Sequence, residues 1–425
     1  MTKHVFIKLG RVLIGISLCV LFPLNAQADT VAYCSVKPTN NALASWLASK
    51  VMQHPSVLAA KAAVETSKFQ KEAASQALYN PELELATESI DEVNTMTVGI
   101  SQTLDWGDGR GAAIKLAASQ FNIANEQLKV QQQETALALL IALSEYHTSE
   151  QRQQLAKQRS QLMERFVTLA KQRFLQGDLT KVDANLAKLS YVQARFNQAS
   201  EQIDSIRSKQ QLISLSGASG LGWPLMPTDF PKPIFQGGSE NMVRQLPQML
   251  LELATVKSAQ AMIKQQTSQS SANPTFSIHA GKEESDNVLG VTFSMPLQFR
   301  NNFKAEISVA NSQLIQAEKQ AASRFRELTR RYNVSTSSYQ LSLEAWRFWQ
   351  QFGEVILNEQ IDLLERLWKA GELSTTDYLI QLVQALETKT AAIQQRGQLW
   401  ENWAQWQLAT GQIAPCLLNE REGEE

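Results

Sequence analysis

The sequence repeats itself at a spacing of about 190 residues. Asn80-Pro81 returns as Asn273-Pro274, and Gly177-Asp178-Leu179-Thr180 returns 194 positions later as Gly371-Glu372-Leu373-Ser374. Solenoid repeats have periods of about 20–50 residues, so this spacing indicates two copies of one large unit. A chain that duplicates so long a unit is expected to build an extended scaffold rather than a single catalytic cleft.

The first residues are typical of a secretory signal peptide. A basic region precedes an apolar run from Val12 to Leu24, and Ala26-Gln27-Ala28 provides a small-residue cleavage site. The run is shorter than the ~20 residues that a membrane-spanning helix needs, and no later stretch reaches that length. We therefore expect a signal peptide at residues 1–28 and an unlipidated mature chain that either stays in the periplasm or crosses a membrane as a β-barrel.

The composition argues against a nucleic-acid partner. The whole chain has 40 basic and 41 acidic residues, and removal of residues 1–28 leaves an excess of acidic ones without any basic block. Two cysteines, Cys34 and Cys416, remain after processing. In an oxidising compartment they could form a disulfide, but the bond needs Cα atoms about 4.4–6.8 Å apart. The sequence leaves the disulfide and two free thiols both open.

Two segments alternate between apolar and polar residues in the manner of β-hairpins. They lie at about 82–105 and about 275–298, and each follows an Asn-Pro pair. Isolated hairpins are not stable in water. Alternation over about ten residues is the pattern of an outer-membrane barrel strand, but a small soluble sheet with one buried face explains it equally well.

Each predicted hairpin leads into a very long helix. Residues 108–174 and 301–368 contain no proline, and Gly353 is the one glycine inside the second stretch. A helix of this length spans on the order of 100 Å and is typical of coiled-coil assemblies. A turn at Gly177 or Gly371 then leads into a return helix, which Thr180 or Ser374 can cap.

These patterns predict a duplicated organisation. A first repeat at 29–215 contains a helix, a hairpin and a long helical hairpin with its tip at 177, and a Gly- and Pro-rich linker follows at 216–240. A second repeat at 241–415 has its tip at 371, and an acidic tail occupies 416–425.

The chain resembles the TolC-like outer-membrane efflux family in its duplicated order of elements and in several short motifs. They are His54-Pro55-x-x-Leu58, Asn80-Pro81-x-Leu83, and the two glycine turns with an Asp six positions after each Gly. The resemblance extends from Asn41 to Thr410. Within the family, the segment from Gln102 to Gly111 is similar to the strand-to-helix junction of heavy-metal (CzcC-type) members.

The resemblance implies a mainly α-helical fold with a transmembrane β-barrel portion. Each chain of a homotrimer would contribute four strands to a twelve-stranded barrel in the outer membrane, continued by an α-helical tunnel in the periplasm. Partners would be two further copies, outer-membrane lipid, a periplasmic adaptor (membrane fusion) protein and an inner-membrane RND pump. Two hairpins are too few to close a barrel, and three chains would solve that problem.

The family also implies where a gate would lie. The tip turns would be Gly177, Asp178, Leu179 and Gly371, Glu372, Leu373, and Asp183 and Asp377 would form a negatively charged ring that favours cations. The alternative is that both Asp residues only support helix N-termini. The best-known family pattern has a Tyr and an Arg around the second glycine, where this chain has Trp368 and Leu373. Apolar packing around Trp368 is therefore expected to close the tip.

Other functions find less support in the sequence. No nucleophile–base pair, phosphate loop, cofactor motif or metal-ligand cluster stands out, so we expect neither an enzyme nor a tight metal site. The favoured function is the outer-membrane channel of a tripartite efflux system that exports heavy-metal cations. Alternatives with the same fold are a type I protein-secretion duct and a multidrug channel. An alternative of another class is a soluble periplasmic helical scaffold.

Overall fold

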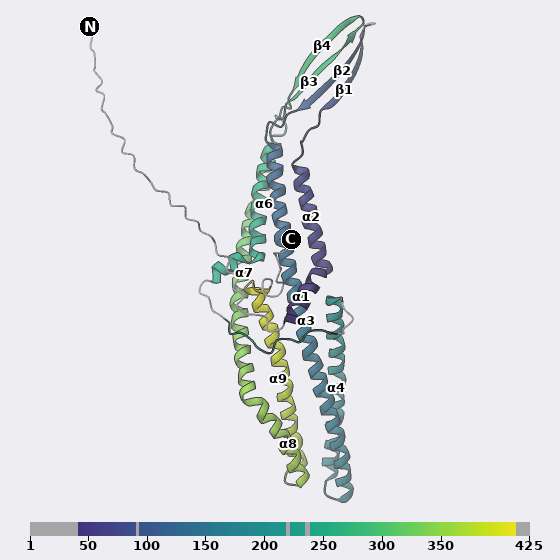
Figure 1. Cartoon of the computed structure of the whole chain (residues 1–425), viewed down its shortest axis with the longest axis vertical. Helices are drawn as coiled ribbons and strands as arrows, with labels where there is room; N and C mark the ends of the chain where they lie inside the picture. The colour runs from purple at the N-terminus through teal and green to yellow at the C-terminus, as the bar shows by residue number, and fades with distance from the viewer. Residues whose placement is uncertain (1–40, 91–92, 218–221, 234–238, 414–425) are drawn as a thin grey trace, which may run out of the picture. The chain divides into compact units, whose positions relative to one another are not determined.

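The computed structural model describes residues 41–90, 93–217, 222–233 and 239–413 (Figure 1). The predicted signal peptide at 1–28, the predicted acidic tail at 416–425, and Cys34 and Cys416 lie outside the described residues.

The described chain consists of two repeats with the same order of elements, which confirms the predicted duplicated fold. The first repeat contains α1 (Asn41–Gln53), α2 (Pro55–Ala74), β1 (Glu82–Ile90), β2 (Val93–Thr103), α3 (Gly109–Gln176) and α4 (Lys181–Ser216). The second contains α5 (Ser239–Gln245), α6 (Pro247–Gln269), β3 (Thr275–Glu283), β4 (Asp286–Ser294), α7 (Lys304–Phe348), the π-helix η1 (Trp349–Gly353), α8 (Glu354–Ala370) and α9 (Thr375–Ala409).

Proline sets the same break in both repeats. Pro55 and Pro247 each occupy the first turn of a helix, α2 and α6, where the missing amide hydrogen costs nothing. His54 caps α2, because its Nδ1 accepts a hydrogen bond from the amide of Ser56 at 3.3 Å. The short helix before each proline therefore ends there, and the following helix leads toward the sheet.

The two hairpins form a single four-stranded antiparallel sheet in the order β1-β2-β3-β4. The strands β2 and β3 pair directly and so join the two repeats. Register aligns side chains of one kind in rows across the sheet: Leu83 pairs with Ile100, Ile100 with Ile278, and Ile278 with Val291. The strands β1 and β4 are the two edges of the sheet.

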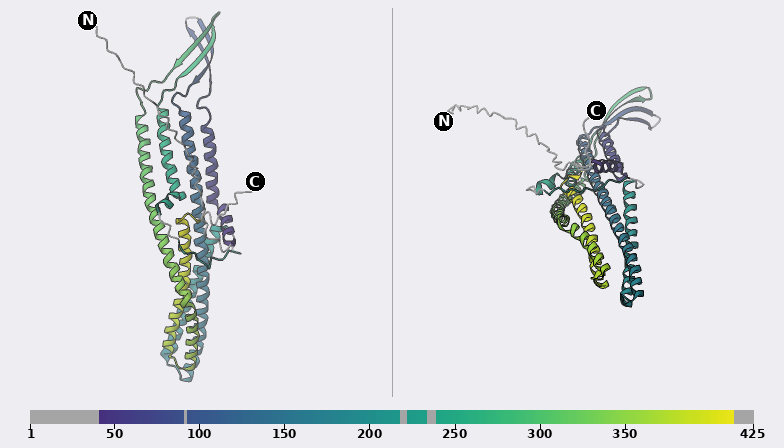
Figure 2. Two further views of the ribbon diagram at one scale, coloured as in Figure 1. Left: turned by 60° about the vertical axis from the view of Figure 1, so that its left-hand side comes forward. Right: turned by 60° about the horizontal axis from the view of Figure 1, so that its bottom comes forward.

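The helix α3 is the central helix of the chain. Near the sheet it contacts α2 on one side and α6 on the other, and α6 contacts α7. Figure 2 shows these four helices side by side. Toward its other end α3 contacts α4 and α9, and α9 contacts α7 and α8. No helix among the described residues is long and apolar enough to cross a membrane.

The two long helices differ in continuity. The helix α3 runs unbroken for 68 residues, whereas its counterpart is divided into α7 and α8 by η1. The second stretch was expected to form one rod, and that expectation is wrong at Trp349–Gly353. Gly353 allows the break, because the ring of Trp349 occupies the space where a Cβ atom at Gly353 would lie.

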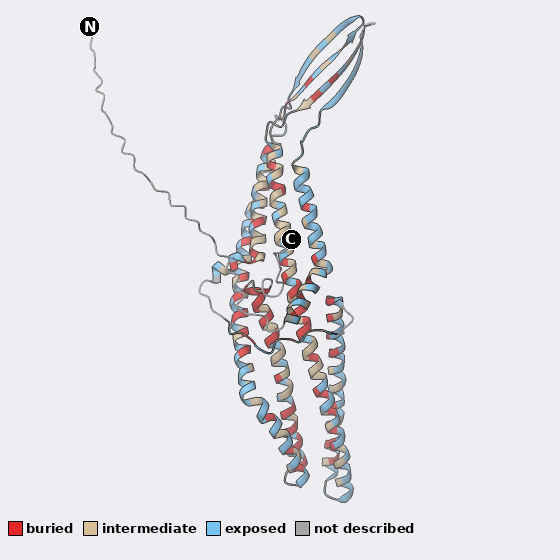
Figure 3. Ribbon diagram, viewed as in Figure 1, coloured by how far each residue is buried: buried red, intermediate tan, exposed pale blue. Residues whose placement is uncertain are grey.

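Buried residues occur along the helices (Figure 3), and their side chains form separate hydrophobic clusters. The largest cluster, which we call the equatorial core, combines residues of α1, α3, α7 and α9 and includes Leu139, Tyr339 and Trp403. A second cluster, which we call the tip core, lies near the two glycine turns and includes Phe166, Trp368 and Leu382.

The part of the linker at residues 222–233 packs on the equatorial core as a strap. Helical side chains bind its backbone oxygens: His147 Nε2 lies 2.9 Å from Pro224 O, Trp400 Nε1 donates to Pro227 O at 2.9 Å, and Tyr339 Oη donates to Pro231 O at 2.6 Å. Met226 and Phe230 of the strap are buried. The strap therefore contacts α3, α7 and α9 at once.

Candidate functional site

The two glycine turns lie at the ends of the long helical hairpins, and we call them together the tip. Gly177 and Gly371 both adopt the left-handed conformation, with φ of +89° and +80°. This conformation costs other residues about 1–2 kcal/mol, so glycine is the residue that ends α3 and α8 without strain. The amides of Asp178 and Glu372 then bind back to the carbonyl oxygens of Arg173 and Leu367, which closes each helix end.

The two aspartates of the predicted aperture ring both make caps. Asp183 Oδ2 accepts from Thr180 Oγ1 at 2.7 Å, and the Asp183 amide donates to the same hydroxyl at 3.2 Å. Asp377 has the equivalent pair with Ser374, at 2.6 and 3.1 Å. Each carboxylate is thus bound at the positive N-terminus of a return helix. The geometry gives both residues a structural role, whether or not they also line an aperture.

Aromatic rings fill the tip core. Trp368 is 3% exposed and contacts both Phe166 and Tyr378, with ring centroids 4.6 and 5.1 Å away. Its Nε1 donates to Thr375 Oγ1 at 3.4 Å. Leu179 and Leu373 pack against the same cluster. Trp368 therefore packs α3, α8 and α9 together inside one chain.

Arg173 connects the two turns, a role that the sequence analysis did not predict. Its guanidinium lies 4.8 Å from the centroid of the Trp368 ring and donates to the carbonyl oxygens of Trp368 and Lys369 at 3.3 and 3.0 Å. Both carbonyls lie in the last turn of α8, where positive charge is favoured, and that of Trp368 also accepts the amide of Gly371. The signal in the sequence is only a basic residue near the end of a helix, which is common.

Burial in the tip core changes the acidity of Tyr378. Removal from water raises the pKa of its phenol to about 12, and the nearby carboxylate of Glu365 adds to the increase while Arg165 opposes it. The ring also stacks on Phe166 at 5.3 Å. Tyr378 is therefore neutral in the folded protein at any physiological pH.

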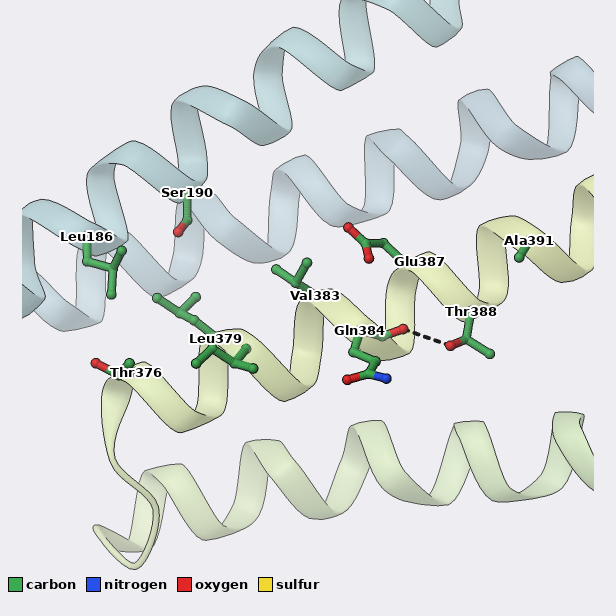
Figure 4. A pocket seen from close by; sticks show the side chains of 10 residues that line it. Leu186, Ser190, Thr376, Leu379, Val383, Gln384, Glu387, Thr388 and Ala391 are labelled. Atoms are coloured by element: carbon green, nitrogen blue, oxygen red, sulfur yellow. Dashed lines mark hydrogen bonds between the residues drawn. The ribbon is translucent and has the colours of Figure 1, made fainter.

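A groove of about 800 Å³ lies between α4 and α9, next to the tip (Figure 4). Leu186 and Ser190 of α4 face it from one side, and α9 contributes the remaining lining residues. Thr388, at its far end, donates to the Gln384 carbonyl within α9 and so leaves no hydroxyl hydrogen for a ligand. The groove has an apolar floor and no cluster of charged groups that would indicate a reaction. Its lining from α9 includes Leu379, Ile380, Val383, Gln384, Glu387, Thr388 and Ala391.

The four-stranded sheet has two chemically different faces. The row Leu83, Ile100, Ile278 and Val291 lies on one face, and all four side chains are at least 60% exposed within the chain. Phe276 and Phe293 extend this face, with centroids 5.0 Å apart. The opposite face contains the row Glu82, Ser101, Ser277 and Thr292.

The junction from Gln102 to Gly111 owes its residue types to local structure. Asp105 accepts hydrogen bonds from the amides of Gly109 and Arg110 at 2.7 and 2.8 Å, and so caps α3. Arg110 in turn donates to the carbonyl of Ser75. At Gly107 a Cβ atom would lie 2.7 Å from Ser268 O. These contacts within the chain account for Asp105, Gly107 and Arg110 of the segment. No group of three or more His, Cys, Asp or Glu side chains suited to a metal occurs in the described part of the chain.

Comparisons with known proteins agree with this architecture. Residues 47–218, which cover most of the first repeat, match the model of the family described as outer membrane efflux protein. A membrane protein from Pseudomonas aeruginosa has a TM-score of 0.74 and 14% identity, covering 87% of this chain and 94% of that one. The fold is that of the TolC-like outer membrane channels.

Two further solved structures share it. The outer membrane protein VceC from Vibrio cholerae has a TM-score of 0.71 and 14% identity over 87% of this chain and 96% of that one. The CmeC outer membrane channel from Campylobacter jejuni has a TM-score of 0.73 and 10% identity over 88% and 86%. None of the curated proteins matches the chain. The match of the first repeat and the shared fold are therefore what this chain has in common with outer membrane channels.

Proposed function

We propose that this chain is the outer-membrane channel subunit of a tripartite efflux system and works as a homotrimer. The observation that carries the proposal is the four-stranded sheet, which has an exposed apolar face and two unpaired edges, β1 and β4. A sheet edge with free amides and carbonyls cannot remain open in lipid. Pairing of β4 with β1 of a next copy leaves no edge once the ring closes, and the apolar face then meets the lipid.

The helices α4 and α7 also have exposed apolar surfaces that could pack against a second copy of the chain. The helix α4 lies at one side of α3 and carries exposed apolar residues at intervals of seven: Val182, Leu189, Phe196 and Ile203. On the other side, α7 carries Val334, Leu341 and Phe348 at the same interval. Seven-residue spacing forms a continuous stripe for helix packing. Head-to-tail contact between the two stripes generates a ring.

The cargo that we propose is a heavy-metal cation. The proposal rests on the resemblance of the segment from Gln102 to Gly111 to heavy-metal members and on the carboxylates at the tip, Asp183 and Asp377. The channel has no energy source of its own, so a periplasmic adaptor and an inner-membrane RND pump would drive export. The same fold would serve drug efflux or type I protein secretion. These functions differ in the substance that is exported.

Growth of a deletion strain tests both levels of the proposal. We expect sensitivity to zinc, cobalt, cadmium, nickel, copper or silver that the intact gene reverses. Sensitivity to dyes, detergents and antibiotics instead would identify a multidrug channel, and loss of a secreted protein would identify a secretion duct. A chain that fractionates as a soluble periplasmic monomer would overturn the channel itself.

A further inference from the structure

A polar cleft of about 420 Å³ lies between the tip and the equatorial core. Its walls come from α3, the last turn of α7, η1, the first turns of α8 and the middle of α9. The volume is within the range of about 300–1,000 Å³ that is usual for pockets that bind small organic molecules. Its lining includes neither of the glycine turns. The cleft is therefore a candidate binding site separate from the tip.

Arg396 of α9 is a partly buried cation in the wall of this cleft. Its guanidinium lies 5.1 Å from the centroid of the Trp400 ring and 5.6 Å from that of the Trp346 ring, and it donates a hydrogen bond to Gln151 Oε1 of α3. Burial lowers the pKa of Arg396, and the charge of Glu354 opposes that change only in part. The protein therefore removes this cation from water without supplying a full counter-charge.

A second cation of the cleft also lacks an ion-pair partner. Lys389 precedes Arg396 by seven residues, so both lie on the same face of α9. Within the part of the chain that the structure describes, neither forms an ion pair with a carboxylate. By contrast, Arg152, the neighbour of Gln151 on α3, pairs with Glu201 at 2.8 Å. The two cations of the cleft are thus placed where a bound anion would complete them.

The other polar groups of the cleft are mostly hydrogen-bond donors. Glu354 is the one carboxylate in its lining, and it is exposed at the start of α8. Each side-chain amide has two N–H groups that an oxyanion can accept. Two cations and several amides against one carboxylate favour a negatively charged ligand. The amides in the lining belong to Gln151, Gln154, Gln158, Gln350 and Asn358.

The rest of the lining is apolar and includes two indole rings. Aromatic side chains provide large apolar contact area and prefer to pack against other flat rings. A ligand that matches both parts of the cleft therefore joins a negatively charged group to a flat apolar body. The apolar lining residues are Leu155, Trp346, Trp349, Leu357, Ala392 and Ile393.

We propose that this cleft binds an organic carboxylate with a flat apolar body. Arg396 and Lys389 hold the carboxylate, the side-chain amides donate to it, and the apolar wall contacts the body. The planar fork of a guanidinium matches the two oxygens of a carboxylate. The charge of this ligand is opposite to that of the proposed metal cargo, so the cleft is a site of its own. The inference rests on residues of one chain and does not depend on the proposed transport function.

Three probes of the same shape but different charge test the ligand class. They are 2-naphthoate, the neutral 2-naphthamide and the cationic 2-naphthylmethylammonium. Each is titrated calorimetrically into the purified full-length protein in detergent, and the heat of protein-free detergent is subtracted. We expect naphthoate to bind about tenfold more tightly than the amide, because two cations contact its carboxylate, and the ammonium to bind least. Equal affinities for the three probes would overturn the proposal, since the apolar wall alone would then account for binding.

Charge removal at the two cations locates the site. Arg396→Gln is expected to weaken naphthoate binding about tenfold and Lys389→Gln about threefold, because the guanidinium offers two parallel hydrogen bonds and the ammonium a point charge. Naphthamide binding should stay unchanged in both variants, which separates loss of the charge from damage to the fold. Arg366→Gln removes an exposed cation of α8 outside the cleft and is the control. Unchanged naphthoate affinity in the Arg396 and Lys389 variants would overturn the assignment.

A gain of affinity covers the case in which loss of Arg396 prevents folding. Glu354→Gln removes the one carboxylate of the cleft at an exposed position, so naphthoate should bind about threefold more tightly. Unchanged or weaker binding would contradict the proposal. Crystals soaked in 6-bromo-2-naphthoate should show the anomalous signal of bromine within the cleft. A bromine site elsewhere, or a carboxylate of another copy of the chain bound to Arg396, would overturn it.

Discussion

Arg173 on α3 and Trp368 on α8 join the two halves of the tip. The guanidinium covers the indole ring at 4.8 Å and donates to the indole residue's own carbonyl oxygen at 3.3 Å. Arg173 of the first repeat thereby contacts both the Trp368 ring and the C-terminal end of α8 in the second repeat. Together with the tip core, the two residues join the first helical hairpin, α3 and α4, to the second, α8 and α9, because α4 and α9 share few contacts of their own.

Arg173→Ala is expected to loosen the tip. It removes the ring contact and two charged hydrogen bonds, which together contribute about 1–3 kcal/mol at a partly buried site. Amide exchange at residues 368–375 should rise accordingly. Arg173→Lys should recover part of the effect, because an ammonium keeps the charge but lacks the planar fork. Arg207→Ala, at an exposed pair with Asp204 on α4, is the control and should leave those amides unchanged.

Gly371 tests the backbone requirement of the turn. Nothing lies within 4 Å of a Cβ atom built there, so strain at φ of +80° is the only cost of a side chain. Gly371→Asn should be tolerated, whereas Gly371→Val should cost about 1–2 kcal/mol more. If the proposed trimeric channel is correct, the trimer on semi-native gels should survive both changes, and export should fail only with valine. Loss of the trimer with valine would mean that the turn serves assembly.

Asp183 and Asp377 can be tested for charge and capping separately. Asn at both positions removes the charge but still accepts the hydroxyl hydrogen bond, whereas Ala removes both and frays the helix start by about 1 kcal/mol. If the carboxylates line the aperture, cation selectivity in planar bilayers should fall equally with Asn and Ala. Unchanged selectivity in the Asn variant would leave only the capping role.

Tyr378 makes the tip sensitive to alkali. Its pKa is about 10 when unfolded and about 12 in the folded protein, so the neutral form is favoured by folding. This stabilisation is complete below pH 10 and is lost between pH 10 and pH 12. At about pH 11 the loss is roughly 1 kcal/mol. Urea unfolding should show that Tyr378→Phe loses less stability between about pH 9 and about pH 11 than the unaltered chain, and equal losses would contradict the prediction.

The sequence predicted the fold because local signals repeat in both halves. The Asn-Pro pairs, the alternating strands and the glycine turns each have a backbone reason, and each occurs twice at one spacing. The break at Trp349–Gly353 escaped prediction, although Gly353 was visible as the single internal glycine. A π-turn depends on how the Trp349 ring packs over that glycine, and periodicity does not encode such a contact.

The tip was predictable in position but not in its connections. Gly177 and Gly371 followed from their sequence context, since left-handed helix ends favour glycine. The contact of Arg173 with Trp368 joins residues 195 positions apart. Nothing in the surrounding residues marks such a long-range partner. Likewise, the position of Asp183 and Asp377 after each glycine indicated a helix start. The sequence could not separate a helix cap from a member of an aperture ring, because both roles require an Asp at this position.

The strap at residues 222–233 is bound largely through its own backbone oxygens, by His147, Trp400 and Tyr339. Every amino acid has such an oxygen. Apart from the buried Met226 and Phe230, and Trp223, whose ring lies 4.6 Å from that of Tyr146, the strap can therefore change its side chains without losing its attachment. In related chains, the strap should therefore vary in sequence more than the helical residues that bind it.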